Sequence, residues 1–392
     1  MIVIKFIFIG SFFLLFWYYG GYMLFLYGLN LVLRRKERGR PVPEDLAACP
    51  FFSLIIPTYN ENKYILDKIR NSLSLEYPAN KLEILIVDSA SQDKTVELAE
   101  KFIENLPGPQ KFQVVLCQQP ERKGKGAAVN YAIAQAKGEV MLITDANCLL
   151  NRKALRFLAP HYRNPNVSAV GGRFQVFERG EKFDGQNKAY WLWEEKMRIL
   201  ESRLDSVICM SGEIGSFRKM TVPYDENSTA EDFELSLHLR EKGGRVAYEP
   251  RALALEEVPR TGPALNIQKK KSVIGTITSL LKHRRLLLNP AFGWYGLLIV
   301  PSHKVLQILS PWLVIVFLLS AEGLMFHLAG PILSLGLNGL ILVMFLFGRR
   351  FLRRARLFAL LEFWILSQWI TLGGWIDFFR GKYSVAWEKV RD

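Results

Sequence analysis

Acidic and amide side chains follow three short apolar segments of the sequence, at the points where these segments stop. The motif Pro57-Thr58-Tyr59-Asn60-Glu61 follows the first, Asp88 ends the second, and Asp145-Ala146-Asn147 ends a later one. A single Asp at such a place is usually a helix cap, because its side chain accepts hydrogen bonds from free backbone amides. Three acidic ends at one edge of a sheet indicate a ligand site instead.

Asp145 and Asn147 offer two side-chain oxygens one residue apart. Hard cations such as Mg²⁺ or Mn²⁺ prefer oxygen ligands and complete their coordination with phosphate oxygens of a substrate. The pair therefore predicts a divalent metal site. Asn147 contributes a neutral carbonyl where Asp would contribute a charge, so we expect a lower metal affinity than two carboxylates would give.

Two further acids, Glu231 and Asp232, stand at the start of an expected helix that runs to Lys242. Acids in a first helical turn commonly stabilise the helix dipole, and that interpretation stays open. A carboxylate beside a bound acceptor can also take the proton of a hydroxyl group, so the same position suits a general base.

A basic, glycine-containing loop over residues 121–128 includes Lys125 and Gly126 and opens another expected helix. Its amides could approach a phosphate group, or it could be an ordinary flexible loop. It lacks the Lys-Ser/Thr end of a P-loop. A dinucleotide-binding fingerprint would follow the first strand, whereas this loop follows the third. ATPase and dehydrogenase functions are therefore disfavoured.

The elements that position these residues read as alternating strands and helices. Short apolar runs without strict alternation predict strands covered on both faces. The expected strands are 52–57, 82–88, 113–117 and 140–145, and the expected helices are 63–73, 94–105 and 126–137. This order predicts an α/β fold with a parallel, doubly wound sheet. Ligands bind beyond the carboxyl ends of the strands in such sheets, where the acidic motifs lie.

Long apolar segments flank this α/β region. No residue from Phe6 to Leu33 is charged, and this run is long enough to cross a membrane as a tilted helix. Segments 305–328 and 331–347 are also long enough, whereas 357–379 contains Glu362, Gln368 and Asp377 and is either a span or an interfacial helix. The basic flanks at 34–40 and 349–356 predict that the α/β region is cytoplasmic.

The net charge of +14 comes from 51 Lys and Arg against 37 Asp and Glu, and the basic residues cluster beside the apolar segments. Such clusters are expected from membrane insertion and anionic lipid, so we expect membrane lipids and no nucleic acid as partners. The four cysteines are widely spaced, which favours neither a disulfide framework nor a zinc site.

Together these segments resemble the inverting glycosyltransferases of family 2, in particular membrane-embedded synthases of cellulose, hyaluronan and poly-N-acetylglucosamine. The resemblance implies a GT-A fold with transmembrane and interfacial helices. It also implies site roles. The nucleotide-base pocket is matched by Pro57, Tyr59, Glu61 and Asp88, and a loop near the nucleotide is matched by Lys125 and Gly126. The metal pair is matched by Asp145 and Asn147, and the general base by Asp232, with Glu231 beside it among the substrate-binding residues. The acceptor-side loop is matched by Ser211, Gly212 and Glu213.

Two positions depart from the family pattern. The metal motif usually ends in a second Asp, where this chain has Asn147. Processive members carry Gln-X-X-Arg-Trp on an interfacial helix, where this chain has Gln268 followed by Lys271 and Ser272. Lys271 keeps a charge that can face diphosphate without the bidentate geometry of Arg. Ser272 offers no aromatic ring to a sugar, so processivity stays open.

The resulting expectation is a membrane-integrated enzyme that transfers a sugar from a UDP-sugar to a polysaccharide or oligosaccharide and forms a β-linkage. Its partners would be the donor, a glycan or lipid-linked acceptor, and polysaccharide export proteins. A single-addition transferase on a lipid-linked acceptor and a catalytically degraded sugar-nucleotide-binding scaffold are the alternatives. The expected parts are a membrane helix with its basic flank (1–40), a cytoplasmic catalytic domain (50–265), interfacial helices (266–303), C-terminal membrane helices (304–380) and a tail (381–392).

Overall fold

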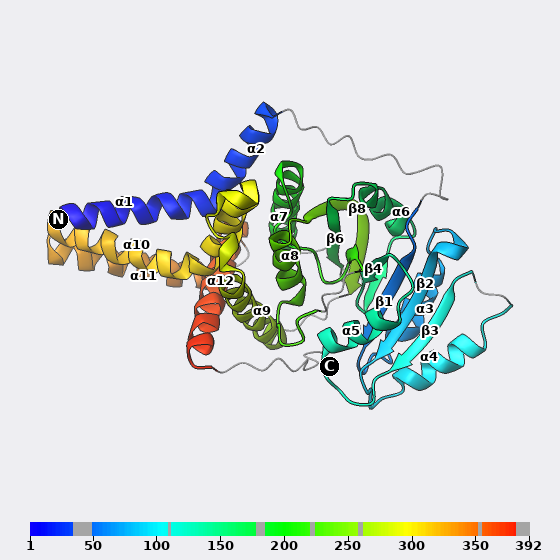
Figure 1. Cartoon of the computed structure of the whole chain (residues 1–392). Helices are drawn as coiled ribbons and strands as arrows, with labels where there is room; N and C mark the ends of the chain where they lie inside the picture. Colours follow the sequence, from blue (N-terminus) through cyan, green and yellow to red (C-terminus); the bar gives the residue numbers. More distant parts are fainter. Residues whose placement is uncertain are drawn as a thin grey trace.

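The computed structural model describes residues 1–33, 49–108, 111–177, 185–219, 224–257, 262–351 and 355–381. An α/β domain lies at one end of the molecule, and a group of long helices extends from it at the other (Figure 1). The basic flank at 34–40 and the tail at 382–392 lie outside the described residues.

One mixed sheet forms the centre of the α/β domain. Its strands, within the described residues, lie in the order β3-β2-β1-β4-β7-β6-β8-β5. Their bounds are β1 (Phe52–Thr58), β2 (Leu82–Asp88), β3 (Gln113–Gln118), β4 (Val140–Ile143), β5 (Cys148–Leu150), β6 (Val167–Phe177), β7 (Gly215–Arg218) and β8 (Arg245–Glu257).

The first half of the sheet confirms the predicted strands. β3, β2, β1 and β4 are all parallel, with Phe52 of β1 opposite Leu82 of β2. The second half was not predicted: β7 is antiparallel to β4 and to β6, whereas β6 and β8 are parallel. β6 is interrupted by two glycines, and a Cβ atom at Gly172 would lie 2.7 Å from the carbonyl oxygen of Ala252. This close approach of two strands requires glycine, which weakens the strand signal in the sequence.

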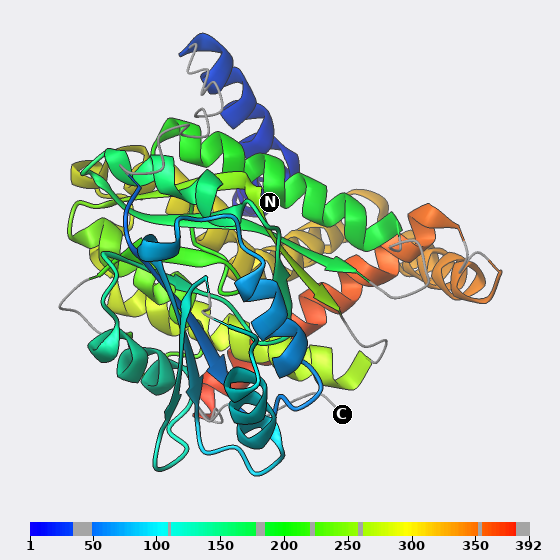
Figure 2. The same cartoon turned by 90° about the vertical axis from the view of Figure 1, so that its right-hand side faces the viewer.

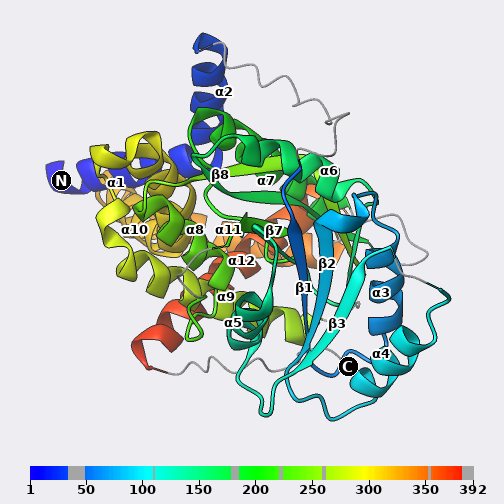
Figure 3. The same cartoon turned by 45° about the vertical axis from the view of Figure 1, so that its right-hand side comes forward.

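Helices cover both faces of the sheet, with α3 and α4 on one face and α5 on the other (Figure 3). The helices of this domain are α3 (Ile65–Leu73), α4 (Thr95–Glu104), α5 (Lys125–Gln135), α6 (Ala154–Leu158), α7 (Gly185–Leu204) and α8 (Glu231–Glu241). Successive strand residues point to opposite faces, so Leu54 and Ile56 belong to one apolar core and Ile55 to the other. All three are fully buried, as a strand covered on both faces requires.

The remaining helices form the second region. They are α1 (Ile2–Phe16), α2 (Tyr22–Val32), α9 (Gly262–Lys282), α10 (Leu306–Ala329), α11 (Pro331–Phe351) and α12 (Arg356–Phe379), with the π-helical segment η6 (Tyr295–Val305) before α10. Among the described residues, three continuous helices are long and apolar enough to cross a membrane: Ile2–Val32, Tyr295–Ala329 and Pro331–Phe351. These correspond to the segments expected from the sequence, and α12 is not among them.

The first of these long apolar helices, Ile2–Val32, is bent rather than straight. A π-helical turn at Trp17–Gly21 separates α1, which runs beside α10, from α2, which turns toward the α/β domain (Figure 1). The Tyr22 hydroxyl donates to Glu201 Oε1 on α7 at 2.8 Å, and Leu26 is fully buried in the same contact. The second half of this helix therefore packs against the α/β domain.

The α/β domain rests on the other helices through an apolar cluster beneath α8. Phe233 of α8 packs with Ile277 and Leu280 of α9 and with Tyr295 and Ile299 of η6. Viewed from the α/β end, the long apolar helices lie behind the sheet (Figure 2). The helix that begins with Glu231 and Asp232 is thus fixed to α9 and η6 through its apolar face.

Candidate functional site

The loops after β1 and β2 bring together the residues expected to hold a nucleotide base. Asp88 is 2% exposed, and its carboxylate accepts from the backbone amide of Ser91 at 2.8 Å. The Thr58 hydroxyl donates to the same carboxylate at 3.4 Å. Pro57 pairs with Val87 in the register of β1 and β2. Asp88 therefore shapes the turn after β2, in addition to any contact with a ligand.

Tyr59 and Glu61 lie in the adjoining loop after β1. Both are 8% exposed, and the Glu61 amide donates to Thr95 Oγ1 at 2.7 Å. The guanidinium of Arg122 lies over the Tyr59 ring, 4.0 Å from its centroid. Since Arg122 belongs to the basic loop before α5, this cation–π contact joins the expected base pocket to the expected phosphate loop.

Lys125 lies at the centre of a second group of predicted residues. It is the first residue of α5, after Gly124 with a φ of 95°. Its Nζ atom lies 2.7 Å from Asp145 Oδ1 and 3.5 Å from Glu231 Oε1. Burial disfavours the charge of this lysine, but Asp145 and Glu231 outweigh that effect and raise its pKa well above the usual value. Lys125 is a fixed cation at the carboxyl edge of the sheet.

Two glycines allow the surrounding loops to approach this lysine. A Cβ atom at Gly212 would lie 3.7 Å from Lys125 Nζ and 3.7 Å from Asp232 Oδ2, so this loop adjoins both side chains. A Cβ at Gly126 would lie 3.2 Å from the Cα atom of Glu226, in the loop that leads to α8. The predicted loop near the nucleotide, the acceptor-side loop and the predicted base therefore converge.

Asn147 is 7% exposed, and its amide donates to Glu256 Oε1 on β8 at 2.7 Å. Together with Asp145, these residues form an all-oxygen set of side-chain acceptors, which suits Mg²⁺ or Mn²⁺. Glu256 supplies a carboxylate next to the position where the family pattern has a second Asp. The residues thus fit the predicted metal.

A buried lysine supports the loop that carries Asp145 and Asn147. Lys68 of α3 is fully buried, and its Nζ donates to Thr144 Oγ1 at 2.8 Å and to the carbonyl oxygen of Cys148. Burial lowers the pKa of Lys68 to about 8. These two contacts tie α3 to the loop that carries the predicted metal ligands and hold its backbone in place.

The acids around Lys125 repel one another. Burial raises the pKa of Glu213 to about 8, and the charges of Asp145 and Glu256 add to that effect. Burial also raises the pKa of Glu231, with a further increase from neighbouring Asp232. Ser211, in the same loop as Glu213, accepts from Arg198 Nη1 of α7 at 3.0 Å. This group of side chains therefore contains more carboxyl groups than Lys125 can neutralise, which favours the binding of a cation.

Helix α9, which contains most of the segment expected to be interfacial, lies against the start of α8. Thr229 Oγ1 donates to the backbone carbonyl of Lys271 at 3.2 Å. A Cβ atom at Gly275 would lie 2.7 Å from Ala230 Cβ, so the two helices meet closely. Gln268 lies on the same helix, and its side chain is outside the described part of the structure. Diphosphate binding by Gln268 and Lys271 stays a prediction.

Sequence reasoning missed Glu256, Lys68 and Arg198 as residues of this site. Glu256 stands near the end of an acid-terminated strand, Leu253-Ala254-Leu255-Glu256-Glu257, which is the same signal that identified Asp88 and Asp145. Lys68 and Arg198 lie in ordinary helical patterns, and no spacing in the sequence distinguishes them. Only their position beneath the loops reveals them.

Comparison with known proteins identifies the family of this chain. The glycosyl transferase family 2 model matches residues 53–221, and the glycosyl transferase family group 2 model matches residues 140–361, more than half of the chain. An N-acetylglucosaminyltransferase of Rhizobium sp. (strain N33) is 28% identical over 259 residues, which cover 62% of this chain and 57% of that protein.

A second relative is the poly-beta-1,6-N-acetyl-D-glucosamine synthase of Staphylococcus aureus (strain COL), 26% identical over 272 residues that cover 68% of this chain and 64% of that protein. The chain thus spans less than two thirds of the length of these relatives.

Among solved structures, the mannosyltransferase PcManGT from Pyrobaculum calidifontis, in complex with GDP-Man and Mn²⁺, matches with a TM-score of 0.71 and 22% identity. The match covers 95% of this chain and 99% of that one, which confirms the GT-A fold with its appended helices. On the strength of the two family models, this chain belongs to glycosyl transferase family 2.

Proposed function

We propose that this protein is a membrane-integrated, inverting glycosyltransferase that uses a UDP-sugar and forms a β-linkage on a growing polysaccharide or oligosaccharide. The observation that carries the proposal is the convergence of Lys125, Asp145, Gly212 and Asp232 at the carboxyl edge of the sheet. A cation, an oxygen ligand set and a candidate base meet there, in the place where an α/β sheet binds its ligand.

The reaction requires charge compensation at one end of the pocket and a proton acceptor at the other. Cleavage of the bond between the anomeric carbon and UDP leaves negative charge on the diphosphate, and Lys125 is positioned to offset part of it. Asp232 takes the proton of the acceptor hydroxyl as that oxygen attacks the opposite face of the sugar. A single displacement inverts the anomeric centre, so an α-linked donor gives a β-linked product.

Asp145, Asn147 and Glu256 are the residues that would hold a divalent metal. Mg²⁺ or Mn²⁺ bound there supplies positive charge to the donor diphosphate. The distances within this group, 2.7 Å for Lys125 to Asp145 and 2.7 Å for Asn147 to Glu256, indicate that each ligand is already held in place by a neighbour.

The donor sugar is proposed to be N-acetylglucosamine, since two of the relatives carry that sugar in their names. The nucleotide-base pocket would be formed by Pro57, Tyr59, Glu61 and Asp88. We propose the cell membrane as the location, with the α/β domain in the cytoplasm where UDP-sugars are made. Export proteins for the product are proposed partners.

The test is nucleotide release by the purified full-length protein. A panel of UDP- and GDP-sugars is supplied with Mg²⁺ or Mn²⁺, and released nucleotide and product length are measured. We expect release from UDP-N-acetylglucosamine that stops with chelator. Binding of UDP-sugars with no release under any metal would support the scaffold alternative, and release from GDP-sugars alone would refute the proposed donor.

A second candidate, addition of one sugar to a lipid-linked phosphate, is favoured by Lys304. This lysine lies in the first of the two C-terminal spans, and its Nζ atom is 5.7 Å from the ring centroid of Phe233, the neighbour of Asp232. A cation at the membrane side of the candidate base suits an anionic lipid headgroup. A phosphate oxygen is already ionised at neutral pH, so transfer to it needs no general base. Product length and the response to Asp232→Asn therefore separate the two candidates.

A further inference from the structure

A group of polar side chains lies where α8 meets the end of α9. Glu234, His238 and Glu241 lie on one face of α8, three and four residues apart, and this face meets the end of α9. His283, the residue after α9, is 3% exposed. Its Nδ1 atom lies 2.8 Å from Glu241 Oε2 and its Nε2 atom 3.0 Å from Glu234 Oε1.

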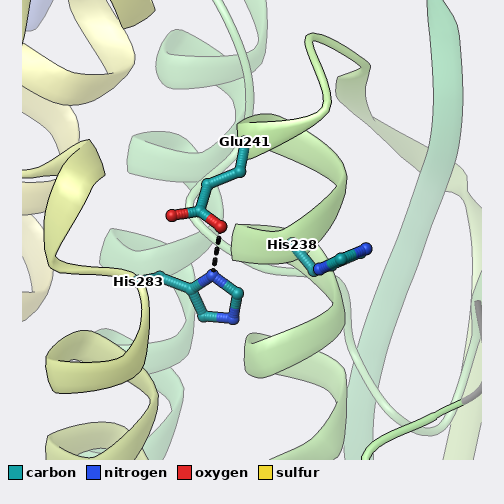
Figure 4. A group of neighbouring side chains, drawn as sticks. All are labelled: His238, Glu241 and His283. Atoms are coloured by element: carbon teal, nitrogen blue, oxygen red, sulfur yellow. Dashed lines mark hydrogen bonds and ion pairs between the residues drawn. The ribbon is translucent and has the colours of Figure 1, made fainter.

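His238 completes the group. One nitrogen of each histidine and one carboxylate oxygen of Glu241 all lie within 4.8 Å of one another, and the two imidazole rings are 6.0 Å apart (Figure 4). Figure 4 shows the Glu241–His283 contact, with the His238 ring extending away from it. Among the described residues, His238 Nε2 is buried and has no hydrogen-bond partner.

We propose that His238, Glu241 and His283 form a second metal site, specific for Zn²⁺ and similar transition ions, that joins α8 to α9. Two imidazoles and one carboxylate are a common zinc ligand set, with a fourth position left for water or another carboxylate such as Glu234. Tetrahedral coordination places ligands roughly 3.4 Å apart, so rotation of the His238 side chain inward closes the remaining distance.

The chemistry of this group differs from that of the Asp145 site. Imidazole nitrogen selects Zn²⁺, Co²⁺ or Ni²⁺ over Mg²⁺, whereas an all-oxygen set suits Mg²⁺ or Mn²⁺. The two sites would therefore take different ions in the same solution. Lys282 Nζ, 2.7 Å from both Glu234 and Asp225, accounts for part of the charge here but leaves the unpaired nitrogen of His238 unexplained.

Metal at this position would fasten the last turn of α8 to the interfacial helix. The first turn of α8 carries Asp232 and already meets α9 at Gly275. A bound ion would hold both ends of α8 to the same helix, so we expect it to raise thermal stability without taking part in the transfer reaction.

The test uses tag-free, full-length protein in detergent, with the Asp145→Asn substitution to weaken the all-oxygen site and excess Mg²⁺ to occupy what remains of it. Co²⁺ is titrated and its visible absorption recorded, because coordination by nitrogen at low coordination number gives strong bands. We expect one Co²⁺ per chain, displaced by Zn²⁺, together with a higher melting temperature. In this protein His238, Glu241 and His283 are unchanged, so absence of tight Co²⁺ binding would overturn the proposal.

Substitution then locates the ion. His238→Gln in the same background should weaken Co²⁺ binding about tenfold or more and remove the shift in melting temperature, since one ligand is lost. The control is His327→Gln at the exposed end of α10, which should leave binding unchanged. Equal affinity in the His238→Gln and control proteins would refute the site. Because these readouts are binding and stability, they are independent of the proposed transfer reaction.

Discussion

The amide nitrogen of Asn147 lies 2.7 Å from a carboxylate oxygen of Glu256, which joins the predicted metal loop to β8. Glu256 is 5% exposed, so its charge is held inside the protein beside the position where the family pattern has a second Asp. This pair changes what a substitution at Asn147 is expected to do. From the sequence alone, Asn147→Asp restores the family motif; in the structure it places two carboxylates in contact.

The first prediction follows from this contact. Asn147→Asp should reduce transfer at saturating Mn²⁺ about tenfold, because Asp cannot donate to Glu256 and the hydrogen bond that holds both side chains in position is lost. The double substitution Asn147→Asp with Glu256→Gln should recover most of the loss, since Gln supplies the missing donor. Initial rates across a Mn²⁺ titration measure both. A double variant no better than the single one would contradict the assignment.

The Asp232→Asn protein should bind the UDP-sugar normally. Its rate of transfer to a hydroxyl acceptor should fall about 10²–10⁴-fold, the usual effect of removing a general base. Donor binding by calorimetry and turnover by UDP release separate the two steps. Asp67→Asn, an exposed acid on α3, is the control. Near-normal turnover by Asp232→Asn would remove the base assignment, or indicate a phosphate acceptor if the product is a single sugar on lipid.

Glu213 should make the metal-free protein less stable as the pH rises. Its pKa is raised from 4.5 to about 8 by burial, so the folded protein holds this proton where the unfolded chain releases it. The stabilising contribution is present below pH 4.5 and is lost as the pH rises through 8. Glu213→Gln mimics the protonated form and should flatten that decline. Melting temperatures in chelator at several pH values measure the slope, and an unchanged slope would contradict the role of Glu213.

The membrane arrangement can be tested by cysteine labelling, because the four native cysteines are all buried. Cysteine at Glu104, an exposed position at the end of α4, should resist an impermeant thiol reagent in intact cells and react after permeabilisation. Cysteine at His327, exposed near the end of α10, should react in intact cells. Short basic segments stay on the cytoplasmic side, which motivates this orientation. The reverse labelling pattern would place the α/β domain outside.

The sequence determined the first half of the sheet and the long apolar helices. Strands β1, β2 and β4 are buried on both faces, so each is a short apolar run that can be recognised without knowledge of its neighbours. The edge strand β3 is partly exposed, so the expectation that it is covered on both faces was wrong, although its position was predicted. The candidate membrane spans at Ile2–Val32 and Pro331–Phe351 follow from length and apolar composition alone. The acidic residues at the strand ends could also be recognised from the sequence. Parallel strands all end at the same edge of the sheet, so residues that follow them are expected to lie together.

Only the tertiary structure decided which side chains complete the site. Glu256 contacts Asn147 from a strand that lies more than a hundred residues later in the sequence. Lys68 contacts Thr144, beside the predicted metal ligands, from a helix that lies 76 residues earlier. The contact of Tyr22, just after the bend at Trp17–Gly21, with Glu201 of α7 likewise joins residues far apart in the sequence. Local spacing carries no information about such pairs, because they form only when separate elements pack. The second metal site, built from α8 and the end of α9, was hidden from the sequence for that reason.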